Sequence, residues 1–474
     1  MPTDSPASWS AIILAAGEGT RMKSKLPKVL HEIAGRTLVS WVVQSALDAG
    51  AARCLVVVGH GRGDVERELV ARFGDRVEMV LQPEQRGTGH AVRCAMEAEE
   101  GLDGRLLVLY GDCPLMPSAL LRDLIDRAAG AGADLALVTA TLDDPFSYGR
   151  IERDAEDRVQ RIVEDRDCSP EQRRLREVNP GLYAIEASFL REAISRLSPD
   201  NAQGQLYLTD VVELAAQRGE VVDLEGDMAD LTGVNDQRDL AMAAATRRRR
   251  INEELAQSGV VIDDLDTVYV DAGCEVEPGA RLGANVHLRG RCVVRTGARI
   301  DVGSVLTNVF VDEGANVLPY TVAAESTIGP GAQVGPFSHM RPDTTLGPRT
   351  KVGNFSETKK TTLGAGSKVN HLSYVGNGEI GEGVNIGAGT IFCNYDGETK
   401  HTTVLEDGVF IGSDTQLIAP VTIGKGAYVA SGTTVTRDVP EDALAMSRTM
   451  LENKEGYAAR LRARLRIKKK PSGS

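Results

Sequence analysis

The sequence predicts two domains of different fold class, an α/β domain with a doubly wound parallel sheet and, after it, a parallel β-helix. The chain has 474 residues, which is too long for a single hydrophobic core. Up to about Asn235, short apolar runs alternate with amphipathic stretches of helix length. Beyond that point apolar residues recur every six positions, and 50 glycines with only 4% aromatic residues agree with a repeat that needs small side chains.

The α/β domain is predicted from buried strands that alternate with helices. We expect strands over 11–17, 54–60, 76–82, 105–112 and 133–140, and helices over 37–50 and 88–100. Such alternation is typical of a doubly wound sheet, in which ligands bind beyond the carboxyl ends of the strands. Gly17 and Asp112 both fall at strand ends of this kind.

A helix is expected between the two domains. Residues 235–259 are rich in alanine and in charged side chains, which favours a helix, and Arg247 to Arg250 within it are interpreted as a solvated face. The basic tail RLRARLRIKKK is interpreted as a solvated terminus. The predicted boundaries are 1–235 for the α/β domain, 236–259 for the linker helix, 260–445 for the β-helix and 446–474 for the C-terminal tail.

The β-helix is predicted from runs of apolar residues spaced six apart. The runs extend from Val270 to Leu306, from Ile328 to Val352 and from Ile411 to Val435. Glycine often stands beside the apolar residue, as in IGPGAQVG, and this pattern is typical of a parallel β-helix. Three steps then close one coil, so residues 18 apart stack about 4.8 Å from each other. A scaffold that only spaces or trimerises other parts is the alternative that the repeat alone leaves open.

Charge and cysteine usage exclude several classes of protein. The net charge of −13 disfavours binding to nucleic acid or to a membrane surface, because carboxylates repel polyphosphates and anionic lipids. The seven cysteines show no CxxC spacing, which indicates reduced thiols in the cytoplasm, and the seven histidines show no zinc-ligand spacing. We find no signal peptide and no apolar run of about 18 residues, and we expect a cytoplasmic protein.

The stretch LAAGEGTRMKSKLPKVL, residues 14–30, follows the first predicted strand and suits a bound phosphate. Small residues expose backbone N–H groups at the strand end, where a phosphate can approach. The spacing matches neither GxxxxGK[ST] nor GxGxxG, so it predicts neither a P-loop ATPase nor a dehydrogenase. Arg21 and Lys28 follow closely and suit the charge that builds on a triphosphate during attack at phosphorus.

The same stretch resembles the opening motif of nucleotide-sugar pyrophosphorylases, and LQPEQRGTGHA, YGDCPL, YGRI, IVEDRD and GVN follow in that family's order. With GPFSHMRP, VGNFSETKK, VNHLSYVG, NIGAGTIFCNYDG and GSDTQLIAPV in the repeat, the chain resembles bifunctional N-acetylglucosamine-1-phosphate uridylyltransferase/glucosamine-1-phosphate N-acetyltransferases over roughly residues 11–448. The resemblance implies a Rossmann-like nucleotidyltransferase domain and a left-handed β-helix. It also implies acetyl transfer from acetyl-CoA to glucosamine-1-phosphate, then UMP transfer from UTP to N-acetylglucosamine-1-phosphate with release of pyrophosphate. The product would be UDP-N-acetylglucosamine for cell-wall precursors.

By this resemblance the first domain holds the uridylyltransferase site, in which Arg21 and Lys28 stabilise the triphosphate. The implied UTP-binding residues are Leu14, Ala15, Ala16, Gly17, Lys28, Gln82, Gly87, Thr88, Tyr110, Gly111 and Asp112. The implied sugar-phosphate residues are Gly149, Glu164, Asn179 and Asn235, although Pro180 stands where the family pattern has threonine. Asp112 ends a strand opposite the phosphate loop, so we expect Asp112 and Asn235 to bind Mg²⁺ that is shared with the phosphates. The chemistry needs no nucleophilic side chain.

The acetyltransferase site is predicted in the β-helix. Arg341 and Lys359 are 18 apart and should stack as a phosphate-binding pair, and Ser413 and Ser431 should form a ladder for a long ligand. The resemblance assigns glucosamine-1-phosphate to Arg341, Lys359, Tyr374 and Asn385, and acetyl-CoA to Ala388, Asn394, Tyr395, Ser413, Ser431 and Arg448. Asn394 and Tyr395 lie in a loop that interrupts the repeat and is expected to project toward a neighbouring subunit of a homotrimer. Ser431 stands where the family has alanine.

His371 is the predicted general base of acetyl transfer. The sugar ammonium must lose a proton before its nitrogen can attack the thioester, and imidazole titrates near working pH. The resemblance places the base at His371, and Glu357 is the expected partner that orients the ring. The alternative function is a single-activity nucleotidyltransferase for another sugar phosphate, with a regulatory or oligomerising β-helix. A purely structural β-helix assembly protein would leave Asp112, Lys28 and His371 without a purpose.

Overall fold

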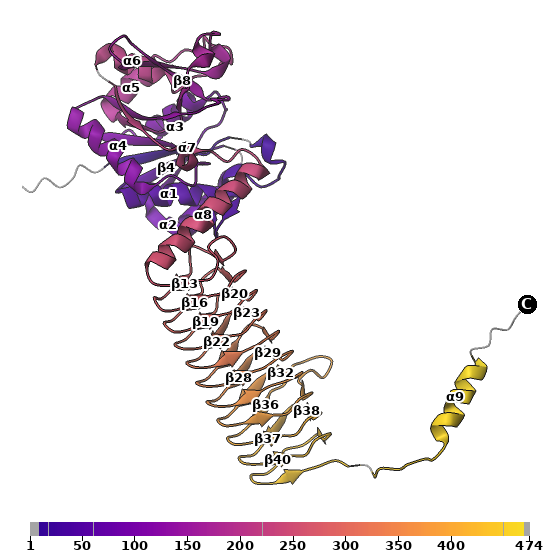
Figure 1. Ribbon diagram of the computed structural model, residues 1–474. Coiled ribbons are helices and arrows are strands. Elements are labelled where there is room, and N and C mark those ends of the chain that lie inside the picture. The colour runs from indigo at the N-terminus through magenta and orange to yellow at the C-terminus, as the bar shows by residue number, and fades with distance from the viewer. Residues whose placement is uncertain (1–8, 18, 60, 220, 449, 469–474) are drawn as a thin grey trace, which may run out of the picture. The chain divides into compact units, whose positions relative to one another are not determined.

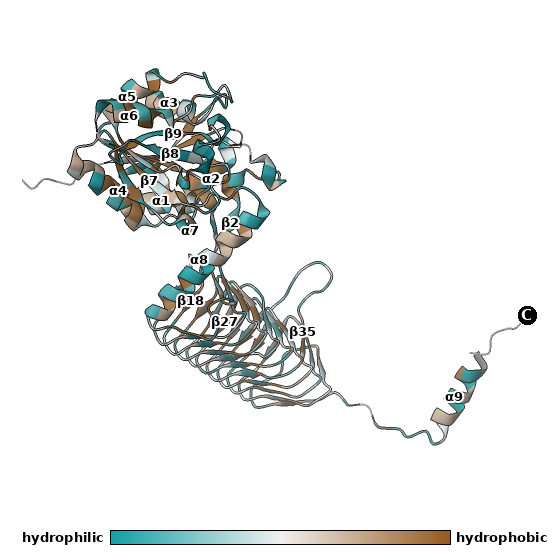
Figure 2. Ribbon diagram, turned by 45° about the horizontal axis from the view of Figure 1, so that its top comes forward, coloured by the Kyte–Doolittle hydropathy of each residue, from teal (hydrophilic) through white to brown (hydrophobic). Residues whose placement is uncertain are grey.

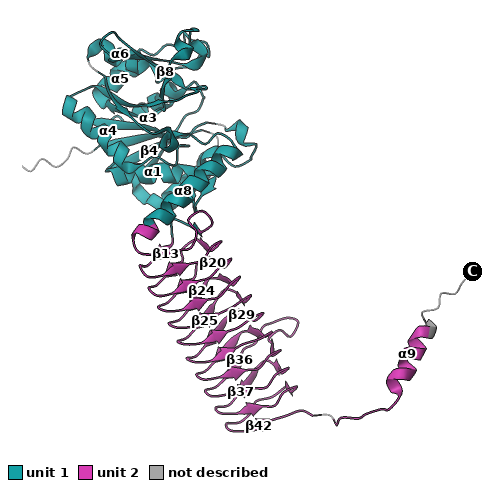
Figure 3. Cartoon of the chain, in the orientation of Figure 1, with its two compact units in different colours: residues 1–254, 269–273 teal, residues 255–268, 274–474 magenta. Residues whose placement is uncertain are grey.

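The computed structural model describes residues 9–17, 19–59, 61–219, 221–448 and 450–468, and the chain divides into two compact units (Figure 1, Figure 3). Unit 1 comprises residues 1–254 and 269–273, and unit 2 comprises residues 255–268 and 274–474. The helix expected over 235–259 is present as α8, Gln237–Gln257. Unit 1 runs to residue 254 and therefore contains most of α8.

The sheet of unit 1 has the strand order β5-β4-β1-β6-β11-β7-β10-β8-β9, with β12 (Val222–Glu225) paired to β7. The predicted strands are β1 (Ser10–Leu14), β4 (Arg53–Val58), β5 (Val77–Leu81), β6 (Arg105–Tyr110) and β7 (Leu135–Thr141), and they run parallel to one another. The remaining strands of the path are β8 (Gly149–Arg153), β9 (Val159–Val163), β10 (Glu177–Asn179) and β11 (Tyr183–Glu186). The prediction of a wholly parallel sheet is wrong, because β11 inserts antiparallel between β6 and β7 and the β8–β10 pairs are antiparallel.

Helices pack on both faces of this sheet, as the doubly wound prediction requires. The helices are α1 (Leu38–Ala49), α2 (Arg62–Phe73), α3 (Thr88–Ala98), α4 (Ser118–Ala131), α5 (Ala187–Ser195), α6 (Asp210–Arg218) and α7 (Met228–Leu231). Side chains alternate along each strand, so Ile13 joins one buried cluster and Ile12 joins the other. The helices predicted over 37–50 and 88–100 are confirmed as α1 and α3. Thr37 caps α1 by accepting from Ser40 N, and Gly50, at a φ of 113°, ends it.

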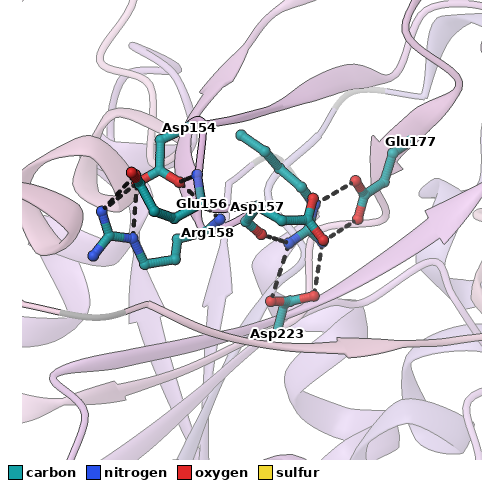
Figure 4. Close-up of polar contacts among 7 residues, drawn as sticks. Asp154, Glu156, Asp157, Arg158, Glu177 and Asp223 are labelled. Atoms are coloured by element: carbon teal, nitrogen blue, oxygen red, sulfur yellow. Dashed lines mark hydrogen bonds and ion pairs between the residues drawn. The ribbon is translucent and has the colours of Figure 1, made fainter.

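An ion-pair network joins the strands that the sequence did not predict (Figure 4). Arg153 at the end of β8 places Nη2 2.6 Å from Glu177 Oε1 on β10 and 2.8 Å from Asp223 Oδ2 on β12. Hydrogen bonds from these two carboxylates raise the pKa of Arg153, so its charge is held firmly. The network fastens the antiparallel part of the sheet to β12.

Unit 2 is a parallel β-helix, consistent with the left-handed form, and its strands form three parallel sheets. One sheet runs from β13 (Val261–Ile262) to β42 (Leu444–Ala445), the second includes β17 (His287–Arg289) to β41 (Thr434–Val435), and the third runs from β15 (Glu275–Val276) to β39 (Val421–Ile423). The predicted repeat positions point into the lumen, since Leu282, Leu288, Val294 and Leu306 are 0% exposed. Apolar residues recur along the coils of this unit (Figure 2).

The strict 18-residue coil is only partly correct. Arg281 pairs with Arg299, 18 positions on, whereas Val293 pairs with Phe310, 17 positions on. The shorter coils have a tighter corner, where Asn308 adopts a φ of 53° and Asn377 a φ of 54°. Asparagine tolerates this left-handed backbone, which removes one residue from the step without breaking the ladder.

The remaining described segments of unit 2 are a loop and a terminal helix. Residues 394–402 leave the stack between β35 (Ile391–Cys393) and β36 (Thr403–Leu405), as Figure 1 shows. The tail forms α9 (Tyr457–Lys468), whose side chains are exposed over 457–466, as expected, and its last residues lie outside the described part. All seven cysteines are described, and none of them forms a disulfide. Within the described residues, no helix is long and apolar enough to cross a membrane.

Candidate active sites

A cavity of about 280 Å³ lies at the carboxyl ends of β1, β5 and β6. Its lining residues are Leu14, Ala15, Ala16, Gly17, Lys28, Val29, Gln82, Gln85, Gly87, Thr88, Ala91, Tyr110, Asp112 and Gln205. Every predicted UTP-binding residue except Gly111 lines the cavity. The sequence reasoning missed Gln85 and Gln205. Gln85 lies inside the recognised motif LQPEQRGTGHA, which would have indicated it, whereas Gln205 gave no signal.

The loop that follows β1, within residues 14–30, leaves the backbone at Gly17 accessible and brings the cation of Lys28 close to it. A Cβ at Gly17 would meet no atom within 4 Å, so the approach to this backbone is open. Gly19 has a φ of 62°, and a Cβ there would lie 2.6 Å from the Cβ of Lys28. Glycine is therefore needed at position 19, because it allows the chain to turn back and bring Lys28 against the loop.

The opposite wall of the cavity is a tight turn before α3. Gln82 is 5% exposed, and its Nε2 lies 3.2 Å from Gly87 O and 3.1 Å from His90 Nδ1. Gly87 has a φ of 105°, and a Cβ there would lie 2.6 Å from Leu206 O. The amide of Gln82 is thus held in one orientation, which suits recognition of a planar, hydrogen-bonding base.

A cluster of cations and oxygens closes the cavity. Lys28 Nζ donates to Asp112 Oδ2 and lies 3.5 Å from Asn235 Oδ1, which also accepts from Arg21 Nη2 at 2.9 Å. The side chains of Lys28 and Asp112 are only 14% and 18% exposed. The two oxygens that were predicted to bind a metal therefore converge on one cation, and this donor set suits a hard divalent ion. Among the described residues, no group of three or more His, Cys, Asp or Glu side chains could hold a metal ion, so a metal at Asp112 and Asn235 would need water or phosphate oxygens as further ligands.

The predicted sugar-phosphate residues lie beside the cavity and do not line it. Glu164 Oε1 accepts from Thr209 Oγ1 at 2.9 Å, and burial raises the pKa of Glu164. Asn179 Nδ2 donates to Tyr183 Oη at 2.6 Å. A Cβ at Gly149 would lie 3.8 Å from Glu164 Cδ, so these positions are neighbours.

Tyr110 connects this group with the cavity. Its side chain lines the cavity, and its ring lies so close to Gly181 that a Cβ there would be 1.9 Å from a ring carbon. Burial and the charge of Glu164 raise the pKa of Tyr110, so its hydroxyl is neutral. Tyr110 thus links the residues around Glu164 to the cavity.

In unit 2, cations gather on one part of the β-helix. His339 pairs with Glu357 and Met340 with Thr358, which places Arg341 and Lys359 on successive coils as predicted. The charge of Arg341, and next that of Lys400, lowers the pKa of Lys359. The sequence reasoning missed Lys400, which lies in the loop 394–402. The sequence signal that could have indicated Lys400 is its place in the loop that interrupts the repeat.

His371 lies on the same unit and has a different partner from the one predicted. Its Nδ1 lies 2.7 Å from Asn354 Oδ1 on the preceding coil, whereas Glu357 Oε1 pairs with Arg341 Nη1 at 2.9 Å. The expectation that Glu357 orients the ring is therefore wrong. The register explains it, since Glu357 stands opposite Tyr374. With Nδ1 donating to Asn354, Nε2 is left as the proton acceptor.

The remaining predicted residues of the acetyltransferase site lie in the C-terminal coils of the β-helix and in the chain that follows them. Ser413 and Ser431 are exposed on successive coils, and Ser413 O accepts from Gly432 N at 2.8 Å. Asn385 pairs in register with Lys368 and Phe410, Ala388 O accepts from Asp414 N at 2.7 Å, and Arg448 is exposed. Tyr395 is 58% exposed, but Asn394 is buried and donates to Asn377 Oδ1 at 2.8 Å. The loop thus presents Tyr395 outward and anchors itself through Asn394.

This pair of folds and sites defines a nucleotidyltransferase joined to a hexapeptide-repeat transferase. The family of MobA-like NTP transferase domains matches residues 11–203, and the family of bacterial transferase hexapeptides (six repeats) matches residues 402–437. The chain is 53% identical over 468 residues to bifunctional protein GlmU of Sorangium cellulosum, covering 97% of this chain and 98% of that protein. Bifunctional protein GlmU of Trichlorobacter lovleyi is 45% identical over 455 residues, covering 96% and 98% of the two chains.

The chain belongs to the bifunctional GlmU family. It is a bifunctional enzyme of UDP-N-acetylglucosamine synthesis, with a uridylyltransferase domain and a hexapeptide acetyltransferase domain. The alternative of a single-activity nucleotidyltransferase is therefore not supported. Nucleotidyl transfer in this family points to a divalent metal and to sugar-nucleotide substrates.

Proposed function

We propose that the cavity of unit 1 binds UTP and transfers UMP to N-acetylglucosamine-1-phosphate, with Mg²⁺ held by Asp112 and Asn235. The observation that carries this proposal is the convergence of Lys28, Asp112, Asn235 and Arg21 beside the open backbone of Gly17. Carboxylate and amide oxygens are hard ligands, and Mg²⁺ takes one or two of them together with phosphate oxygens. When bound, Mg²⁺ would neutralise part of the triphosphate charge.

The protein's own cations perform the rest of this step. The sugar-phosphate oxygen attacks the α-phosphorus of UTP, and pyrophosphate leaves. Lys28 and Arg21 bind the oxygens of Asp112 and Asn235. A bound triphosphate would compete with these oxygens for both cations and would draw the two side chains toward its own negative charge. Because the Lys28–Asp112 pair is mostly buried, these charges act in a medium that screens them little.

The sugar phosphate is proposed to bind beside Tyr110. Glu164 is held by Thr209, and its second oxygen is free to accept from sugar hydroxyls. Asn179 pairs in register with Gly149, and Gly149 neighbours Glu164, so these three residues would form one side of the sugar subsite. The raised pKa of Glu164 reflects burial, and a ligand hydroxyl would offset that cost by donating to the carboxylate.

Unit 2 is proposed to acetylate glucosamine-1-phosphate, with His371 as the general base. Asn354 fixes the ring so that Nε2 takes the proton from the sugar ammonium as its nitrogen attacks the thioester carbonyl. Arg341 and Lys359, with Lys400 close to Lys359, would hold the phosphate of the sugar. Tyr374 and Asn385 would complete this subsite, and acetyl-CoA would lie along Ala388, Ser413, Ser431 and Arg448, with Asn394 and Tyr395 at its edge.

A homotrimer is proposed as the working assembly, in the cytoplasm where UTP and acetyl-CoA are made. The exposed Tyr395 in a loop outside the coil is one support. A second is a stacked stripe of Tyr320, Phe337 and Phe355, which are 51%, 50% and 58% exposed, with ring centroids 5.3 and 5.6 Å apart. Exposed apolar stripes of this kind mark contact surfaces. The proposed domain boundaries are 1–235, 236–259, 260–445 and 446–474.

One incubation tests both activities. The full chain is mixed with glucosamine-1-phosphate, acetyl-CoA, UTP and Mg²⁺, and the products are read by mass spectrometry over time. We expect N-acetylglucosamine-1-phosphate first and UDP-N-acetylglucosamine with pyrophosphate afterwards. Direct uridylylation of glucosamine-1-phosphate at the same rate would contradict the proposed substrate of unit 1, and sedimentation of the chain as a monomer would contradict the trimer.

A further inference from the structure

Two arginines of α8 donate to the chain that follows Asp112. Arg247 Nη2 donates to Pro114 O, and Arg250 Nη1 donates to Leu115 O at 2.8 Å. Residues three apart on a helix share a face, so both guanidinium groups lie on the same face of α8. The interpretation of Arg247 to Arg250 as a solvated face is therefore wrong for these two residues. It holds for Arg249, which is exposed and pairs with Glu253 at 2.9 Å.

These contacts are partly buried. The guanidinium of Arg247 lies 4.0 Å from the centre of the Trp41 ring, and burial lowers the pKa of Arg247 to about 10. Arg250 also pairs with Asp230. Leu115 is 4% exposed in a cluster of buried side chains that includes Trp41. A partly desolvated hydrogen bond of this type is stronger than a fully solvated one, so it fixes the backbone position more firmly.

The other side of Asp112 is held by the chain that leads into α8. Val234 N donates to Asp112 O at 2.9 Å, and Val234 directly precedes Asn235. Asp239 in the first turn of α8 accepts from Asn235 N at 2.9 Å. The helix therefore contacts Asn235 directly through its first turn, and it contacts the segment that follows Asp112 through its third and fourth turns.

We propose that Arg247 and Arg250 are positioning residues for uridylyl transfer, which hold the Pro114–Leu115 backbone and so keep Asp112 in place relative to Asn235. This inference rests on the proposed function of the cavity. It makes α8 part of the nucleotidyltransferase site as well as the connection to unit 2. Removing one of these donors frees the segment after Asp112 and leaves a buried carbonyl without its partner.

The test uses the full chain with Arg247→Met and Arg250→Met, which keep much of the side-chain length and remove the donors. Arg249→Met is the matched control on the exposed face of the same helix. Binding of Mn²⁺ in the presence of UTP is measured by electron paramagnetic resonance, and uridylyl transfer is measured against Mg²⁺ concentration. We expect each variant to lose about 10-fold or more in Mn²⁺ affinity and in rate at limiting Mg²⁺, the usual cost of removing support behind a metal ligand.

Two further variants separate the possible outcomes. Arg247→Lys and Arg250→Lys keep one donor and should recover part of the Mn²⁺ affinity, which also decides the case if the Met variants unfold. Acetyl transfer should be unchanged in all of them. If the Arg247→Met and Arg250→Met variants fold and bind Mn²⁺ as tightly as the parent, while Asp112→Ala is inactive, the positioning role is wrong. If Asp112→Ala itself keeps the parent rate, the proposed function of the cavity fails instead.

Discussion

The two units assemble their sites in opposite ways. In unit 1, Arg21 and Lys28 of one loop meet Asp112 and Asn235, which come from two distant parts of the chain, at one edge of a sheet. In unit 2, the paired side chains stand one coil apart, as Asn354 and His371 do. In the repeat, residues at a fixed spacing in the sequence become neighbours in space. In the sheet, which distant residues become neighbours depends on the order of the strands.

The units also differ in how far their charged groups are buried. The Lys28 and Asp112 side chains are 14% and 18% exposed, whereas those of Arg341 and Glu357 are 38% and 37% exposed. Solvent screens the attraction between Arg341 and Glu357, whereas the attraction between Lys28 and Asp112 is screened much less. Single substitutions in unit 1 should therefore have larger effects than substitutions of exposed groups in unit 2, and four measurements test this contrast.

The largest effect is expected at Asp112. Asp112→Ala should lower uridylyl transfer by about 10³-fold, because it removes an electrostatic group from a desolvated site and leaves Lys28 without its partner. Acetyl transfer, measured on the same preparation with acetyl-CoA and glucosamine-1-phosphate, should stay at the parent rate. Asp112→Asn serves as the isosteric control and should also be strongly impaired, since it keeps the oxygen and loses the charge. A rate within threefold of the parent would refute the assignment.

The second effect is expected at His371. His371→Ala should lower acetyl transfer by about 10²-fold, the lower end of what a lost general base costs. Asn354→Ala should have a smaller effect, because it removes the group that orients the ring and leaves the imidazole present. Initial rates across pH 6 to 9 measure both, and His401→Ala, in the loop 394–402, is the control histidine. Equal losses in His371→Ala and Asn354→Ala would argue that the ring acts only through its hydrogen bond.

The third effect concerns pH and the stability of unit 1. Burial, with the charges of Glu164 and Glu213, raises the pKa of Asp210 to about 6, so the ionised form is disfavoured by folding. The stabilisation is complete below the pKa of an unfolded aspartate, about 4, and is lost as the pH rises through 6. Asp210→Asn should therefore stabilise the unit at pH 7.5 by about 1 kcal/mol after allowance for solvent screening.

Thermal unfolding at pH 4.5 and pH 7.5 measures this difference. The substitution should change the midpoint at pH 7.5 and have little effect at pH 4.5. Asp123→Asn, an exposed carboxyl on α4, is the control. A gain that is the same at both pH values would show that the side-chain amide, and not the lost charge, is responsible.

The smallest effect is expected at Ser431. Ser431→Ala introduces the alanine that the family resemblance leads us to expect at this position. Because the Ser431 side chain is exposed, the KM for acetyl-CoA should stay within about twofold of the parent value. Ser413→Ala on the preceding coil is the paired variant. A tenfold rise in either KM would show that the hydroxyl ladder binds acetyl-CoA directly, and the contrast between buried and exposed groups would then fail for this unit.

The sequence determined the elements whose physics is local or periodic. The repeat positions reach the lumen as expected, with Leu288 and Leu306 fully buried, and the strands and helices with strong apolar patterns are α1, α3 and the five parallel strands. Most of the residues that the family motifs predict to bind UTP line one cavity. These features survive because burial of apolar side chains at a fixed period needs no knowledge of distant neighbours.

Only the tertiary structure decided which distant groups meet. The insertion of β11 between β6 and β7 follows from long-range pairing that no local pattern encodes. The partner of His371 is Asn354 and not Glu357, because the pairing between successive coils places Glu357 opposite Tyr374, three residues beyond His371. The contacts of Arg247 and Arg250 depend on which face of α8 packs against the segment after Asp112. A run of four arginines does not reveal whether their side chains will meet water or a buried carbonyl.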